Sequence, residues 1–147
     1  MSEPVRRFED FRWEATDLLA YKEEGSAPFK AITRQILFKR DDLQSELRYF
    51  EVAPHGFSTL ERHEHVHGVL ILRGHGRCLN GDYVGPVNTF DLITIAPMTW
   101  HQFRADDEPL GFLCMVNVQR DKPQLPAAED IAGLRKNPAV AAFLDDK

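Results

Sequence analysis

Short apolar runs with interspersed polar positions, separated by turn residues, dominate the middle of the chain. The runs are rich in β-branched and aromatic residues, which is typical of strands. We expect strands over residues 31–38, 46–53, 66–73, 91–96, 100–104 and 110–118. Turn signals recur about every eight to twelve residues, with no helical period between them, so the pattern predicts an all-β sandwich or barrel rather than alternating βαβ units.

The clearest local signal is a hairpin centred on Asn80 and Gly81, between the strand-like segments 77–79 and 82–84. Asn and Gly both tolerate positive φ, which a two-residue hairpin turn requires. We therefore expect these two residues at the centre of a tight turn.

The two ends of the chain differ from this middle part. Apolar and aromatic residues that can fasten an N-terminal arm onto the barrel or onto a second subunit are Phe8, Phe11, Trp13, Leu18, Leu19 and Tyr21. Beyond Pro126 the spacing of Ile131, Leu134, Val140, Phe143 and Leu144 predicts short amphipathic helices, the last one starting at Asn137 and Pro138. The expected organisation is one domain: an arm over 1–30, a β-barrel over 31–120 and a helical tail over 121–147.

Composition narrows the class of protein. The 147 residues are 43% hydrophobic and 28% charged with a net charge of −5, as in an ordinary single globular domain. The charge and the lack of a basic run argue against nucleic acid as a partner, and no apolar run is long enough to span a bilayer. The N-terminus lacks the apolar core of a secretory signal, so we expect a cytoplasmic protein. Cys78 and Cys114 are expected to be reduced and buried rather than bridged.

Histidines supply the candidate chemistry. Five of the six lie within residues 55–75, and the sixth, His101, opens a later apolar segment. Neutral imidazole is the commonest protein metal ligand, so the cluster indicates a metal site built from His63, His65, His67 and His101. His55 and His75, each beside glycine, are expected to be a turn residue and an exposed residue.

Residues 63–67 match the zinc-protease pattern H-E-x-x-H, which requires a helix. The flanking sequence is strand-like and glycine-bounded, so we set this interpretation aside. On an extended strand, residues 61 and 67 would lie roughly 20 Å apart, because each residue rises about 3.3 Å. If they share one ion, the chain must bend between His63 and His67; otherwise only His63 and His65 bind together.

Residues 46–118 resemble a cupin domain, a small jelly-roll barrel or double-stranded β-helix. Aligning the first cupin motif on Gly74 puts Glu61 and His63 in its two histidine places and His67 in its carboxylate place. Aligning it on the His-x-His pair uses His63 and His65 instead. We favour the glycine alignment, but the sequence leaves both open.

The second cupin motif resembles residues 91–103, with Asp91 opening the strand and His101 as the metal histidine. The chain departs from the pattern at Phe90 and Thr99, where the family has glycine, and at Ala105, where asparagine is common. Histidine at position 67 shifts the ligand set toward nitrogen.

The resemblance implies a cupin-type barrel that holds one divalent transition metal ion: Zn, Fe, Ni, Mn or Cu. It is compatible with a metal-dependent enzyme acting on a small organic molecule, dioxygenase-like or isomerase-like, with Glu61 or Glu64 as acid or base. The alternatives are a non-catalytic small-ligand or metal-binding sensor module, and a metal that only braces the barrel. The family also suggests a homodimer. Candidate pocket residues are Arg48, Tyr49, Gln102, Phe103 and Cys114.

Overall fold

A computed structural model describes residues 4–20 and 30–146 of the chain. Three short strands belong to the N-terminal arm: β1 (Phe8–Glu9), β2 (Arg12–Trp13) and β3 (Leu19–Ala20). The barrel strands are β4 (Lys30–Arg40), β5 (Ser45–Phe57), β6 (His67–Arg73), β7 (His75–Asn80), β8 (Tyr83–Asn88), β9 (Leu92–Ile95), β10 (His101–Ala105) and β11 (Leu110–Asn117). Two helices follow, α1 (Ala128–Leu134) and α2 (Pro138–Asp145).

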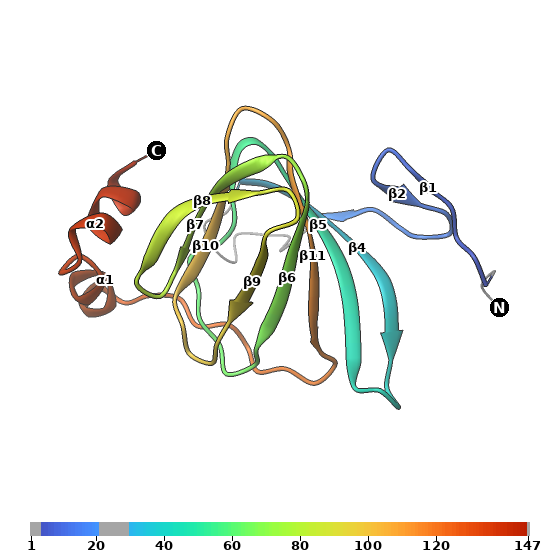
Figure 1. Cartoon of the computed structure of the whole chain (residues 1–147). Helices are drawn as coiled ribbons and strands as arrows, with labels where there is room; N and C mark the ends of the chain where they lie inside the picture. Colours follow the sequence, from blue (N-terminus) through green and yellow to red (C-terminus); the bar gives the residue numbers. More distant parts are fainter. Residues whose placement is uncertain (1–3, 21–29, 147) are drawn as a thin grey trace.

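The barrel strands form one curled antiparallel sheet in the described part of the chain (Figure 1). The order β8-β7-β10-β5-β11-β6-β9 brings distant segments together, and β4 lies along β5. Because strands far apart in sequence are neighbours in the sheet, the start of β10 comes beside the segment that precedes β6. This arrangement confirms the all-β, cupin-type prediction.

Alternation along the strands decides which side chains fill the barrel. On β5 and β11 the even-numbered residues face inward, and Phe50 and Phe112 stack with ring centroids 5.7 Å apart. Phe103 of β10 joins the same cluster, with its ring centroid 4.8 Å from that of Phe112. The apolar interior also contains Val52, Val69, Ile71, Ile95 and Leu110, all buried.

The predicted strands all exist, with ends that differ by a few residues. The hairpin is also present, but its turn lies one residue later than predicted. Asn80 pairs with Tyr83, so Gly81 and Asp82 form the loop. Only Gly81 has positive φ there, at 65°, which leaves Asn80 free to extend β7.

Gly74, on which the cupin alignment rests, joins β6 to β7 with a φ of 72°. A Cβ at this position would lie 2.0 Å from the carbonyl oxygen of Pro109, so the close approach of the β10–β11 loop requires glycine. Phe90 occupies a left-handed position as well, with φ 74°. Phe90 stands where the cupin pattern has glycine. It keeps the left-handed backbone conformation, which is strained for a residue with a side chain.

The described part of the N-terminal arm packs on the outer face of the sheet. Phe11 stacks on Tyr49 at 5.8 Å, and Trp13 lies 5.2 Å from the same ring. Gln35 donates to the carbonyl oxygen of Phe11. Leu18 and Leu19 are exposed, and Tyr21 lies outside the described residues.

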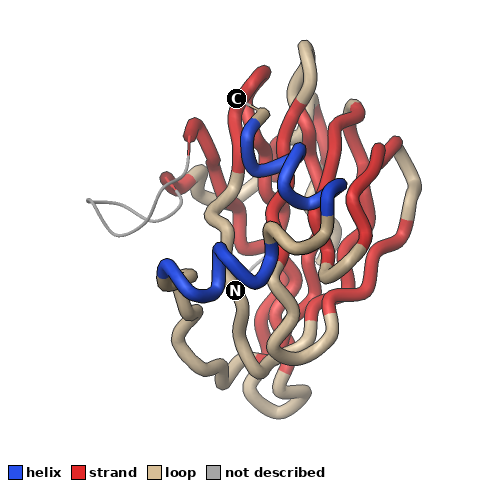
Figure 2. The backbone as a smooth tube through the Cα atoms, turned by 90° about the vertical axis from the view of Figure 1, so that its left-hand side faces the viewer, coloured by secondary structure: helices blue, strands red, loops and turns tan. Residues whose placement is uncertain are grey.

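The C-terminal helices lie on one side of the barrel (Figures 1 and 2). Asn137 caps α2 by accepting from the backbone N–H of Ala139, and Pro138 is the first helical residue, as predicted. Val140 and Phe143 of α2 pack with Leu79 of β7 in a second, smaller apolar cluster. Neither helix has the length and apolar character needed to span a bilayer, and this holds for all helices within residues 4–20 and 30–146.

Candidate metal centre and cavity

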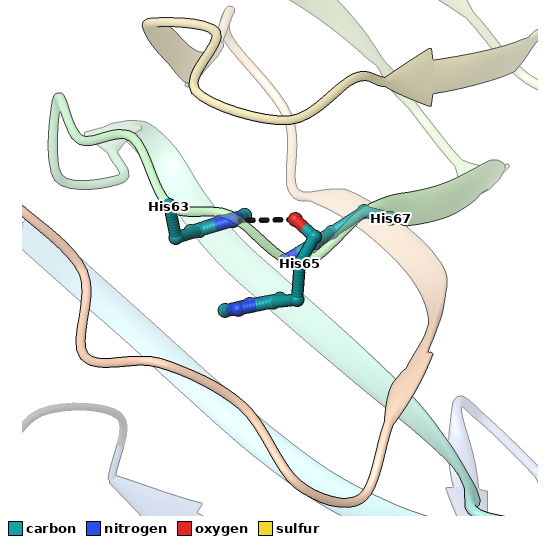
Figure 3. A group of neighbouring side chains, drawn as sticks. All are labelled: His63, His65 and His67. Carbon is teal, nitrogen blue, oxygen red and sulfur yellow. Dashed lines mark hydrogen bonds between the residues drawn. The ribbon is translucent and has the colours of Figure 1, made fainter.

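The chain bends at Glu64 and His65, so that three alternate histidines face one point instead of following one another along a strand (Figure 3). The rings of His63 and His65 stack with centroids 3.7 Å apart, and His67 lies 4.5 Å from His63. The segment is not helical, which excludes the protease-type helix. An extended strand would hold His63 and His67 too far apart to share an ion, and this bend brings them close enough.

His101 reaches the same point from the start of β10. Its backbone exchanges two hydrogen bonds with Glu61, at 3.0 and 3.3 Å, so that both side chains are held on neighbouring extended segments. The ring of His101 lies 4.9 Å from that of His63 and 5.8 Å from that of His67. The peptide N–H of Met98 also donates to the carbonyl of His63, which fastens the two motif segments together.

Among the residues that the structure describes, two overlapping groups have ligand atoms within 4.8 Å of one another. One is His63, His65 and His67; the other is Glu61, His63 and His101. His63 is common to both. The glycine alignment takes members from both groups, because it pairs Glu61 and His63 with His67, so the choice between the two alignments stays open.

Hydrogen bonds donated by Nδ1 orient three of the imidazole rings. His63 Nδ1 donates to the carbonyl of His65 at 2.7 Å, His101 Nδ1 to that of Thr99 at 2.9 Å, and His65 Nδ1 to Asp121 at 2.8 Å. With Nδ1 protonated, the Nε2 atom of each ring carries a lone pair. The Nε2 atoms of His63 and His67 are buried and have no hydrogen-bond partner, which is the state expected of ligands shaped for a metal ion.

Burial disfavours the protonated form of two histidines at this centre. It lowers the pKa of His67 to about 2, with the nearby His63, His101 and Arg48 adding to the effect. Burial also lowers the pKa of His65, although its hydrogen bond to Asp121 opposes this. Because coordination requires the unprotonated ring, both histidines are ready to act as ligands at neutral pH.

Asp121 supports the histidine bend from the segment that follows β11. Its carboxylate accepts from the backbone N–H of Glu64 at 2.8 Å, from that of His65 at 3.1 Å, and from the His65 ring. These hydrogen bonds, the one from Glu64 first, hold the pKa of Asp121 far below its usual range. Arg62 and Gln124 exchange backbone hydrogen bonds beside it, so residues 121–124 form a clamp over residues 62–65.

A cavity of about 50 Å³ opens from this centre into the barrel. Glu61, His67 and His101 lie on its wall, together with three of the predicted pocket residues, Arg48, Phe103 and Cys114. The rest of the lining is mainly apolar: Ile32, Phe50, Val69, Ile95 and Phe112, with Ser58 and Thr59. A mostly apolar cavity with a few convergent polar groups is the usual form of a small-molecule site.

The other predicted site residues lie elsewhere. Tyr49 is buried on the outer face under the N-terminal arm, where its hydroxyl donates to Glu51 at 2.9 Å. Gln102 donates to the carbonyl of Ser58 and lies in a groove beside His55 and His75. The side chain of Glu64 is exposed.

Comparisons with known proteins agree with this architecture. The family model described as a cupin domain matches residues 48–116. A crystal structure of a cupin 2 conserved barrel domain protein from Rhodopseudomonas palustris is 51% identical, covering 95% of this chain and 97% of that one, with a TM-score of 0.89. A cupin-2 domain structure from Rhodospirillum rubrum is 60% identical over 97% of both chains, with a TM-score of 0.87.

The chain belongs to the cupin family. A curated relative of this cupin, 61% identical over 144 residues, is the 1-methylthio-D-xylulose 5-phosphate methylsulfurylase of Rhodospirillum rubrum. The match covers 97% of this chain and 92% of that protein.

Two residues of this cupin's site were not identified from its sequence. Asp121 lies in a polar, proline-containing segment that reads as a loop, and nothing local connects it with His65, 56 positions away. Thr59 precedes the histidine cluster. On an extended chain it lies on the same face as Glu61 and His63, and this spacing is the sequence feature that could have identified it. Cys114 is a predicted pocket residue, but the sequence gives no sign that its Sγ lies 3.0 Å from Nδ1 of His67.

Proposed function

We propose that this cupin is an enzyme that removes the methylthio group from a phosphorylated methylthio-ketose. The substrate class is that in the name of the relative from Rhodospirillum rubrum, 1-methylthio-D-xylulose 5-phosphate. The observation that carries the proposal is the cavity itself, which brings a buried thiol, Cys114, to the same wall as the imidazoles of His67 and His101. A thiol beside the proposed metal ligands supports a reaction in which the methylthio sulfur is transferred.

His63, His67 and His101 are the residues that we propose hold one divalent transition metal ion, with Glu61 or His65 completing the set. Nitrogen-rich donors favour zinc, iron, nickel, manganese or copper over calcium and magnesium. When bound, such an ion acts as a Lewis acid for the ketone oxygen of the substrate. Glu61, His67 and His101 lie on the cavity wall, so this side of the centre is the one that faces a substrate.

Cys114 is the candidate nucleophile. Its Sγ atom lies 3.0 Å from His67 and 3.4 Å from Nη2 of Arg48. Burial raises the pKa of this thiol, and the charge and hydrogen bond of Arg48 act in the opposite direction by stabilising the thiolate. Glu46 holds Arg48 in place through an ion pair at 3.5 Å, and Arg120 reaches the same carboxylate at 3.2 Å.

The bond changes follow from the position of the methylthio group, next to the ketone carbon. The Cys114 thiolate attacks the thioether sulfur, an Sγ–S bond forms, and the bond from sulfur to C1 breaks. The electron pair passes to the ketone as an enolate, which takes up a proton at C1. With His65 completing the ligand set, Glu61 is the carboxyl on the described cavity wall and therefore the candidate donor of that proton, whereas Glu64 is exposed.

The cysteine then carries a methyl disulfide and must be regenerated. A low-molecular-weight thiol that attacks this disulfide leaves with the methylthio group and restores the Cys114 thiolate. The overall reaction thus converts the methylthio-ketose and one thiol into a deoxy-ketose and a mixed disulfide. The dioxygenase-like, isomerase-like and sensor interpretations stay predictions, and no feature of the described site favours them over this one.

The experiment incubates the metal-loaded protein with 1-methylthio-D-xylulose 5-phosphate and a thiol such as dithiothreitol, and follows the C1 protons by NMR. A new C1 methyl signal supports the proposal, and Cys114→Ala should lower its rate of appearance by roughly 10³-fold or more. Cys78→Ala is the matched control, because Cys78 is equally buried but does not line this cavity. Unchanged substrate after prolonged incubation with the wild-type protein contradicts the proposed function, and full activity of Cys114→Ala contradicts the role of the thiol.

A further inference from the structure

A threonine hydroxyl in the wall of the cavity lacks a partner. Thr59 is 2% exposed, and its Oγ1 atom is buried without a hydrogen bond to any group in the structure. Buried hydroxyl groups are normally hydrogen-bonded, because leaving one unpaired costs free energy. The unpaired Nε2 atoms of His63 and His67 are accounted for by a metal ion, whereas this hydroxyl is not on either candidate ligand set.

The backbone directs Thr59 toward the same side as the metal-site residues. Residues 58–61 run extended beside β10, with Ser58 bonded to Phe103 and Glu61 bonded to His101. Burial alternates along this segment, where Thr59, Glu61 and His63 are buried and the residues between them are only half-buried. Alternate residues of an extended chain share one face, so Thr59 adjoins Glu61 on the inner wall.

The neighbouring hydroxyl shows what a structural role looks like in this segment. Oγ of Ser58 accepts from the backbone N–H of Phe103 at 2.8 Å, and the Ser58 carbonyl accepts from Gln102. Ser58 therefore joins two strands. Thr59 makes no such hydrogen bond through its side chain, so the hydrogen-bonding capacity of its hydroxyl is unused at the cavity wall.

We propose that Thr59 is a substrate-binding residue that hydrogen-bonds a hydroxyl or carbonyl oxygen of a polyhydroxy ligand. This inference rests on the proposed function, which supplies a short ketose phosphate. Thr59 lies two residues from Glu61, a rise of roughly 7 Å along an extended segment. If one oxygen of a short sugar chain lies at the metal centre, the next oxygens along that chain can span this distance and contact Thr59.

The test measures binding of D-xylulose 5-phosphate, which carries the ketone and hydroxyl groups but no methylthio group, by calorimetry. Thr59→Val keeps the shape of the side chain and removes the hydroxyl, and should raise the Kd about tenfold. Thr59→Ser keeps the hydroxyl and should bind nearly as tightly as the wild type. Thr94→Val is the matched control, because Thr94 is exposed and does not line the cavity.

Deoxy analogues of the same probe separate a direct contact from a structural effect. We expect the analogue that lacks the contacted hydroxyl, at C3 or C4, to bind the wild type about tenfold more weakly than the parent compound does. Thr59→Val should bind this analogue and the parent compound equally, because the partner of the missing hydroxyl is already gone. If the contacted atom is the ketone oxygen, the alcohol reduced at C2 should show this pattern instead.

The outcomes distinguish this inference from the proposed function. If the wild type converts the methylthio-ketose but Thr59→Val binds the probe with unchanged Kd, the hydroxyl contacts a buried water only and the inference is wrong. If Thr59→Val loses the same factor in affinity for the parent compound and for every analogue, the residue has a structural role, and the inference is also wrong. If the wild type neither converts the methylthio-ketose nor binds the probe, the proposed function fails and the inference falls with it.

Discussion

The imidazole rings of His63 and His67 lie with centroids 4.5 Å apart and planes within 15° of each other. On an unbroken strand the Cα atoms of residues four apart are separated by roughly 13 Å, so the bend at Glu64 and His65 creates this proximity. The same bend leaves His63 between two possible ligand groups. It therefore makes His63 the residue on which metal binding should depend most.

His63→Ala should reduce the bound metal per chain at least about tenfold, because this histidine belongs to both ligand groups. His65→Ala and Glu61→Ala then separate the groups, since each variant removes a member of one set only. Elemental analysis of the purified variants provides the measurement. His75→Gln, a change at a histidine outside the centre, should keep full metal content, and an unchanged stoichiometry in His63→Ala would end the metal-site proposal.

Asp121→Ala should weaken metal binding about 10–100-fold without removing any ligand, because the carboxylate orients the His65 ring and the bend that carries it. Competition with a chromogenic chelator measures the affinity. Asp107→Asn, in the loop at the opposite end of β11, is the control. Wild-type affinity in Asp121→Ala would mean that the clamp of residues 121–124 does not govern the site.

Phe90→Gly should raise the free energy of unfolding by about 0.5–1 kcal/mol. Phe90 is 74% exposed and has a φ of 74°, so glycine relieves left-handed strain while little packing is lost. Phe90→Ala removes the same ring but keeps the strain, and should give no such gain. Urea denaturation of the metal-free proteins measures both, and equal stability of the glycine and alanine variants would contradict the strain explanation.

The ion pair between His75 and Asp106 should stabilise the folded state only at acidic pH. The hydrogen bond to Asp106, 2.9 Å from Nδ1, raises the pKa of His75, and the charges of Glu108 and Asp107 add to this. A raised pKa means that the folded state favours the protonated ring. The contribution is therefore complete below the ordinary pKa of about 6.5 and is lost as the pH rises through the folded-state value.

Thermal melts of Asp106→Asn and the wild type measure this difference. The variant should melt slightly lower at pH 5.5 and at the same temperature at pH 9. The effect should shrink in high salt, because the pair is exposed. A difference that is constant across this pH range would assign it to the backbone contacts of the loop instead.

The expected homodimer has a candidate surface on the outside of the sheet. Phe38 of β4 pairs across the sheet with Leu47, which pairs with Met115 of β11. Phe38 is 49% and Met115 54% exposed, so this apolar row is available to a second copy. We expect sedimentation to show dimers that Met115→Asp weakens, whereas a wild-type monomer at micromolar concentration would contradict the expectation.

Local pattern alone determined the fold class and most of the secondary structure. Strand positions follow from alternation and β-branched composition, and the start of α2 follows from Asn137 and Pro138, because these preferences act within a few residues. The hairpin was one residue out, since Asn80-Gly81 and Gly81-Asp82 both suit a two-residue turn and the pairing of Asn80 with Tyr83 selects the second. The histidine cluster likewise indicated a metal site but not its ligand set.

Tertiary structure decided the rest, because contacts between distant segments leave no local signal. The bend that gathers His63, His65 and His67 is stabilised by Asp121, and the order of strands brings His101 to Glu61. The same strand order places Cys114 against His67 and Thr59 in the cavity wall, whereas Tyr49 and Gln102 point elsewhere. Which side chains share a site depends on how the sheet curls, and no spacing rule within one strand contains that information.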